Sequence, residues 1–222
     1  MESKIININR LYKLHTRNVH KRKIGDKMSE NSLTKDRMLE IEALANSITK
    51  NLDFKKSPFV DITSLVKKDG FTITQKLLDL DTTGILRVDE SDMTNPIREI
   101  IVNEIFSNPD KDEDVVFKKG RLIAAHEYSH YKLHMPPNLT YYAHRDSSKR
   151  NTPQELEADF CARSILMPRN EFSAYYDIAK EVGGDDKSFI IKSLSKLFGV
   201  TMKKIRERIS DIEELKGLSQ NG

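Results

Sequence analysis

Apolar residues after position 32 recur at the spacing of helices, with one group of strand-like runs between them. From Leu33 to Leu52 the apolar positions share one face of a helix. A shorter helix is predicted over 61–68, with Asp61 as its N-cap. Further helices are predicted over residues 121–134, 153–167, 171–181 and, as a pair, within 187–215.

Three short runs predict the strands. Residues 71–75 alternate between apolar and polar, whereas 84–89 and 98–103 are rich in β-branched residues and bounded by turn residues. Together they predict a small three-stranded antiparallel sheet, so the expected fold class is α+β and mostly helical. Residues 98–103 are further predicted to form an edge strand, to which an extended peptide could add by backbone pairing.

Changes in pattern divide the chain into three segments. Residues 1–32 show no clean period and are predicted to be a mobile basic arm. Residues 33–182 then form the main domain, and 183–222 form a helical hairpin that begins at a pair of glycines. The hairpin has the helix, glycine turn, helix spacing of a helix-turn-helix.

Composition is that of a globular protein outside the membrane. Of 222 residues, 32% are charged and 37% hydrophobic, and no apolar run reaches the roughly 18 residues of a membrane span. The N-terminus lacks the apolar core of a secretory signal. A single cysteine, Cys161, excludes an intramolecular disulfide and a multi-cysteine zinc site. These features predict a cytoplasmic protein without a membrane partner.

Charge is distributed unevenly. The first 30 residues carry eight Lys and Arg against three acids, so the arm accounts for the net charge of +3. The second helix of the C-terminal hairpin carries Lys203, Lys204, Arg206 and Arg208, but acidic residues are interspersed among them. A DNA-binding regulator that uses this helix pair and the arm is therefore an alternative function, which the charge alone does not favour.

The most informative stretch is His126-Glu127-Tyr128-Ser129-His130, an H-E-x-x-H within an apolar helical run. Two histidines four residues apart leave the same face of a helix, where they can bind one Zn²⁺. Glu127 would lie beside the metal and accept a proton from water. A buried amphipathic helix with two hydrogen-bonded histidines is the simpler interpretation of these five residues.

A third metal ligand is expected from the helix over 153–167. The pattern in which a third histidine follows in the same segment is absent, since Pro136 stands at that position. Glu155 and Asp159 are four residues apart, which suits one ligand and one carboxylate that accepts a hydrogen bond from a ligand histidine. Glu155 also follows Thr152 at capping-box spacing, so its side chain could merely cap the helix, and Glu157 remains an alternative ligand.

Three segments in order, AAHEYSHYKLH, YYAHRD and ELEADFCARSILMP, resemble the ImmA/IrrE family of zinc metallo-endopeptidases. The resemblance implies a gluzincin-like core on a small sheet, with residues 33–182 as the metallopeptidase domain. It also implies that His126, His130 and Glu155 bind the metal and that Glu127 is the catalytic acid and base. Ser129 departs from the family, which usually has glycine there, but no ligand is lost.

The expected function is therefore zinc-dependent hydrolysis of a peptide bond in a protein substrate. The resemblance implies a helix-turn-helix repressor of a mobile element or a stress response as that substrate. Mn²⁺ or another divalent ion could replace Zn²⁺. Tyr142 and His144 lie between the two zinc-binding segments and are candidate donors to the transition state. A metal-binding sensor without catalysis is a further alternative.

Overall fold

The computed structural model describes residues 32–92, 94–104, 113–135, 141–146 and 152–216. Residues 33–222 form one compact unit that is distinct from residues 1–32. The predicted basic arm therefore lies outside the described residues, apart from Ser32. The predicted boundary at residue 183 falls inside the unit.

Seven helices occur among the described residues, and each predicted helix is found. Their bounds are α2 (Lys35–Thr49), α3 (Ile62–Lys68), α4 (Glu113–His134), α5 (Pro153–Leu166), α6 (Arg169–Gly183), α7 (Lys187–Phe198) and α8 (Met202–Lys216). Asp61 caps α3 as predicted, because its side chain accepts a hydrogen bond from the amide of Ser64 at 3.2 Å. Helix α4 starts upstream of the predicted residue 121, so the H-E-x-x-H segment occupies its second half.

The strands β1 (Thr72–Lys76), β2 (Thr82–Asp89), β3 (Ile97–Asn103) and β4 (Tyr141–Asp146) form one sheet in the order β1-β3-β2-β4. Strand β1 is parallel to β3, whereas β2 is antiparallel to both β3 and β4. The fold class is α+β as predicted, but the sheet is mixed, so the prediction of an antiparallel sheet was wrong.

The position of β3 explains this difference. Residues 100–103 are consecutively buried, so both faces of this part of the strand are covered. A strand with such a continuous apolar run belongs in the interior of a sheet, and β3 lies between β1 and β2 with both of its edges paired. The prediction that residues 98–103 form an edge strand was therefore wrong. The edges of the described sheet are β1 and β4, and no pattern in the sequence predicted β4.

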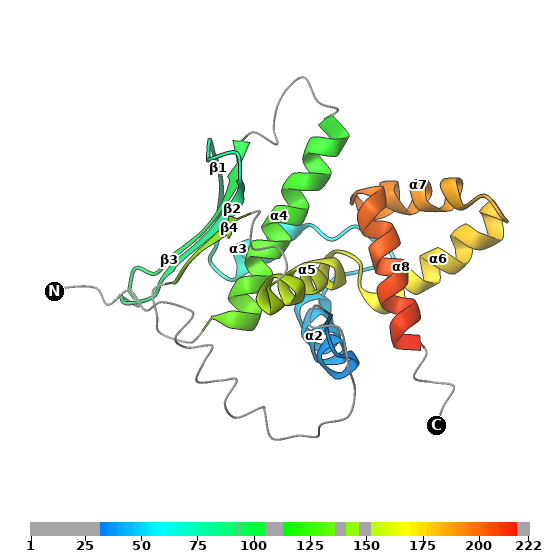
Figure 1. Ribbon diagram of the computed structural model, residues 1–222, viewed down its shortest axis with the longest axis horizontal. Coiled ribbons are helices and arrows are strands. Elements are labelled where there is room, and N and C mark those ends of the chain that lie inside the picture. Colours follow the sequence, from blue (N-terminus) through cyan, green and yellow to red (C-terminus); the bar gives the residue numbers. More distant parts are fainter. Residues whose placement is uncertain (1–31, 93, 105–112, 136–140, 147–151, 217–222) are drawn as a thin grey trace. The chain divides into compact units, whose positions relative to one another are not determined.

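Helix α4 is the central element of the unit. Figure 1 shows it between the sheet and α5, and it packs against β2 and β3 on one side and against α5 on the other. Because two layers cover this helix, residues around its whole circumference are buried, among them Ile123, Ala125 and Tyr128. Any polar side chain in this stretch must therefore find its partners inside the protein.

Helix α8 is joined to α2 and α5 by a buried ion pair. Arg208 has no exposed surface, and its guanidinium pairs with both carboxylate oxygens of Glu42. Its Nε atom donates to the carbonyl of Met167 at 2.9 Å, and Ser164 donates to Glu42 at 3.0 Å. Arg208 thus ties the C-terminal hairpin to α2 and α5. We call the group formed by Arg208, Glu42, Ser164 and the Met167 carbonyl the Arg208 junction.

A second buried arginine joins the turn between α7 and α8 to α4. Arg121 of α4 donates hydrogen bonds to the carbonyls of Phe198 and Gly199. Gly199 ends α7 with φ at +61°, a backbone conformation that favours glycine. A Cβ atom there would lie 2.4 Å from the guanidinium of Arg121, so both the conformation and the contact require glycine.

Candidate metal centre

Helix α4 presents both histidines of the H-E-x-x-H segment on one face, toward α5. His126 is fully buried and His130 is 4% exposed. Their Nε2 atoms are 2.9 Å apart, and the two rings meet nearly edge to face. The four-residue spacing on a helix produces this approach, as predicted from the sequence.

Glu155 of α5 completes the group. One oxygen of its carboxylate lies 3.2 Å from Nε2 of His126, and the other lies 3.2 Å from Nε2 of His130. The helix start is capped by Thr152, whose hydroxyl accepts a hydrogen bond from the backbone amide of Glu155. This cap uses only the backbone of Glu155, and its side chain contacts both histidines.

Glu157, the alternative ligand, is held elsewhere. Its two carboxylate oxygens accept hydrogen bonds from Arg37 of α2 at 2.9 and 2.7 Å. This two-pronged pair fixes the carboxylate on the side of α5 that packs against α2. No pattern in the sequence indicated Arg37, because it lies 120 residues before its partner.

His126, His130 and Glu155 together could hold a metal ion, because their donor atoms all lie within 4.8 Å of one another. Ligands about 2.0–2.1 Å from a tetrahedral Zn²⁺ lie roughly 3.3 Å apart. The observed separations of 2.9 and 3.2 Å are close to this value. Two imidazoles and one carboxylate are also a known donor set of catalytic zinc sites, in which a fourth position stays open.

Asp159 fixes the orientation of His126. Its carboxylate lies 2.9 Å from Nδ1 of His126, so Nδ1 carries the proton and donates a hydrogen bond to Asp159. The lone pair of Nε2 then points toward His130 and Glu155. A carboxylate in this position behind a histidine is frequent at metal sites, where it fixes the ring of the ligand.

The protonation states suit a cation. Burial lowers the pKa of His130 to about 4, so its ring is neutral near pH 7. Burial alone would raise the pKa of Glu155, but the two histidine rings beside its carboxylate outweigh burial and hold that pKa well below its usual range. A metal ion binds neutral imidazoles and an ionised carboxylate, which is the state these shifts favour.

Glu127 occupies a different position from the three convergent groups. Its side chain is fully buried, and it lies on α4 against strand β2. The potential metal-binding group found among the described residues does not include it. Glu127 directly follows His126 in the sequence, and its role as a general base stays a prediction.

The remaining sequence candidates lie in β4 and at the end of α4. Tyr142 and His144 belong to β4, where they pair with Arg87 and Ile85 of β2. Their side chains lie outside the described residues, so their predicted role as transition-state donors stays a prediction. His134 is not part of the group: its Nε2 lies 3.2 Å from the carbonyl of Gln154, and its ring centroid lies 5.5 Å from that of His130.

Comparisons with protein-family models and with curated protein sequences found no match to this chain. Among the described residues, every helix is too short or too polar to cross a bilayer. The fold and the site define an α+β protein with a buried His-His-Glu group between two packed helices, and the functional argument rests on that group.

Proposed function

We propose that this protein is a zinc-dependent endopeptidase. The observation that carries the proposal is the convergence of His126, His130 and Glu155 from two separate segments, with Glu127 buried one residue beyond the first ligand. A purely structural helix has no need to bring three such groups together at the cost of burying them. The combination of a metal-binding group and a glutamate that follows its first histidine in the sequence is typical of metallopeptidases.

The side chains would divide the reaction between them. Zn²⁺, when bound, supplies a Lewis acid that polarises the scissile carbonyl and lowers the pKa of water. His126, His130 and Glu155 would hold the ion, and Asp159 would keep the ring of His126 in position. Glu127 would accept the proton of the attacking water and deliver it to the leaving amine. The site lies among buried side chains, which exclude competing water.

The motif resemblance supports a more specific form of this proposal. It points to the ImmA/IrrE family, a gluzincin-like core and a helix-turn-helix repressor as the protein substrate. The three resembling segments form the second half of α4, strand β4 and most of α5. A cytoplasmic location is part of the proposal and rests on the single cysteine.

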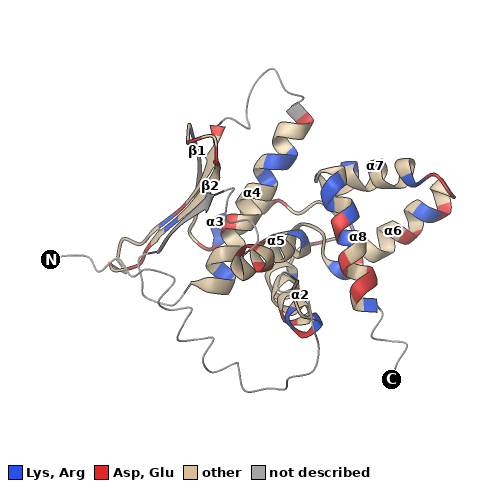
Figure 2. Cartoon of the chain, viewed as in Figure 1, with Lys and Arg blue, Asp and Glu red and all other residues tan. Residues whose placement is uncertain are grey.

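The alternative of DNA binding loses support at α8. Of the four basic residues that would form its recognition surface, Arg208 is fully buried against Glu42, and Lys204 is 9% exposed and pairs with Glu207. Figure 2 shows acidic residues beside the basic ones along this helix. Because Arg208 is buried inside the protein, it cannot contact a DNA phosphate.

The test uses the full chain with Zn²⁺ and a helix-turn-helix repressor encoded beside it. We expect one bound ion per chain and a truncated repressor. Glu127→Gln should keep the ion and lower the cleavage rate by roughly 10²- to 10⁴-fold, because only proton transfer is removed. Bound zinc without cleavage would favour the sensor, and salt-sensitive DNA binding by the full chain would favour the regulator.

A further inference from the structure

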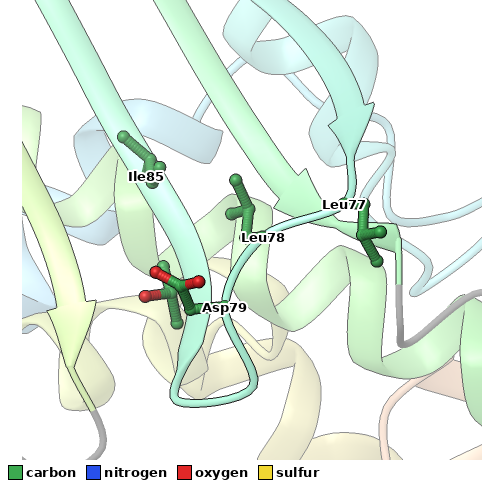
Figure 3. A pocket seen from close by; sticks show the side chains of 5 residues that line it. Leu77, Leu78, Asp79 and Ile85 are labelled. Carbon is green, nitrogen blue, oxygen red and sulfur yellow. The ribbon is translucent and has the colours of Figure 1, made fainter.

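Strand β2 contains an irregularity next to the candidate site. Thr82 and Ile85 pair with residues of β4 that are only two apart, so Thr83 and Gly84 stand opposite a single residue of the partner strand. This is a β-bulge, which locally redirects a strand and is frequent beside active sites. Thr82 and Ile85 line the same hollow, in which Figure 3 labels Ile85. The Cβ position of Gly84 instead points toward Ile123 and Glu127 of α4.

Gly84 makes an unusually close approach to α4. A Cβ atom at this position would lie 2.6 Å from Cγ2 of Ile123 and 2.9 Å from Oε1 of Glu127. Both neighbours are buried, with Ile123 5% exposed and Glu127 fully buried, so neither can move into solvent without repacking the helix. Only glycine fits between strand and helix here.

We infer that Gly84 is a positioning residue for Glu127. The backbone of β2 at residue 84 packs against the carboxylate of Glu127. A methyl group there would displace Oε1 of that carboxylate. The glutamate side chain has three rotatable bonds, so close contact with β2 limits where its carboxylate can lie. The inference rests on the proposed function, since positioning matters to catalysis only if Glu127 transfers the proton.

The first experiment compares Gly84→Ala with Gly120→Ala in the full, zinc-loaded chain. Gly120 lies on α4, and a Cβ atom there would meet nothing within 4 Å, so this variant is the matched control. Because a misplacement of about 1 Å can lower a rate by roughly 100-fold, we expect Gly84→Ala to lower kcat by at least about tenfold. KM should stay within about twofold and zinc affinity within about threefold, because no ligand is touched.

Two results would overturn the inference. If the kcat of Gly84→Ala is within about twofold of that of the parent, the contact at residue 84 does not position Glu127. A zinc affinity that falls in parallel with kcat would show general damage to the site. In both cases Gly120→Ala should match the parent protein.

A second measurement separates this inference from the proposed function. Thermal unfolding of the metal-free protein reports the contact between residues 84 and 127 without any hydrolysis. The fall in Tm caused by Gly84→Ala should be smaller in a Glu127→Ala background, because one of the two obstructing side chains is gone while Ile123 stays. Equal falls in both backgrounds would overturn the contact. If the parent protein cleaves no substrate, the proposed function fails. The Tm comparison still shows whether residues 84 and 127 are in contact.

If Gly84→Ala does not fold, Ile123→Ala provides the background. It removes the nearer of the two obstructions and leaves the one with Glu127. Gly84→Ala is then judged against Ile123→Ala by the same zinc, kcat and Tm measurements, with the same outcomes for and against.

Discussion

Two clusters of buried polar groups flank α5, and they differ in what their atoms face. At the Arg208 junction, guanidinium N–H groups meet carboxylate and carbonyl oxygens, so every contact pairs a donor with an acceptor. At the metal centre, two imidazole nitrogens and a carboxylate face one another across 2.9–3.2 Å. The first cluster is complete by itself, whereas the second brings lone pairs together around one point.

The comparison separates a structural use of buried charge from a functional one. A buried ion pair is tolerated when its hydrogen bonds are satisfied, and it then fixes how elements pack. Convergent lone pairs repel one another unless a proton or a cation lies between them. The Arg208 junction therefore explains how α8 is held against α2 and α5, and the proposed metal ion would explain why α4 and α5 carry such costly side chains.

The largest expected effect concerns the junction. Arg208→Met leaves the buried carboxylate of Glu42 without its cation and should lower the free energy of unfolding by about 3–5 kcal/mol. Urea unfolding of the metal-free protein measures this loss. The double variant Glu42→Leu with Arg208→Met should recover most of it, because no uncompensated charge remains. A double variant as unstable as the single one would contradict the structural role.

The next effect concerns the choice between two glutamates on α5. Glu155→Gln removes the charged ligand and should weaken zinc binding by at least about 100-fold, measured by competition with a chromophoric chelator. Glu157→Gln is the matched control, since its carboxylate pairs with Arg37, and its zinc affinity should be within about threefold of the parent. The reverse ranking of the two variants would exclude Glu155 as the ligand.

The smallest effect concerns the carboxylate behind His126. Asp159→Asn keeps the size of the side chain but removes the charge that holds the proton on Nδ1. Loss of such a group typically weakens metal binding by about 10- to 100-fold, and the same chelator competition measures it. The unfolding free energy of the metal-free protein should change less than for Arg208→Met. An unchanged zinc affinity would mean that Asp159 does not orient the ligand.

Much of the site was predictable because its parts are local. The H-E-x-x-H spacing places His126 and His130 on one face of a helix, whatever surrounds that helix. The four-residue spacing of Glu155 and Asp159 likewise places both on one face of α5, and Thr152 marks where that helix begins. Glycine inside the strand pattern at residue 84 was a usable signal of a bulge or a close approach, but its partner was not visible.

Other features depend on segments that are distant in the chain. Arg37 distinguishes Glu157 from Glu155, although 120 residues separate Arg37 from Glu157. The order of the strands depends on which strand is covered on both faces. Strand β3 is covered in this way and lies in the interior of the sheet, whereas the prediction placed it at the edge. Arg208 was a candidate for DNA contact because it lies on a basic helix. Packing of α8 against α2 and α5 instead buries it in an ion pair with Glu42.

The sequence by itself determined the helices, their caps and the faces on which the metal-binding side chains lie, because these follow from backbone geometry over a few residues. Only the tertiary structure decided which glutamate meets the histidines, which strand is central and which arginine is buried. Those outcomes depend on which surfaces pack together, and burial makes each polar group take the partner that packing brings within reach.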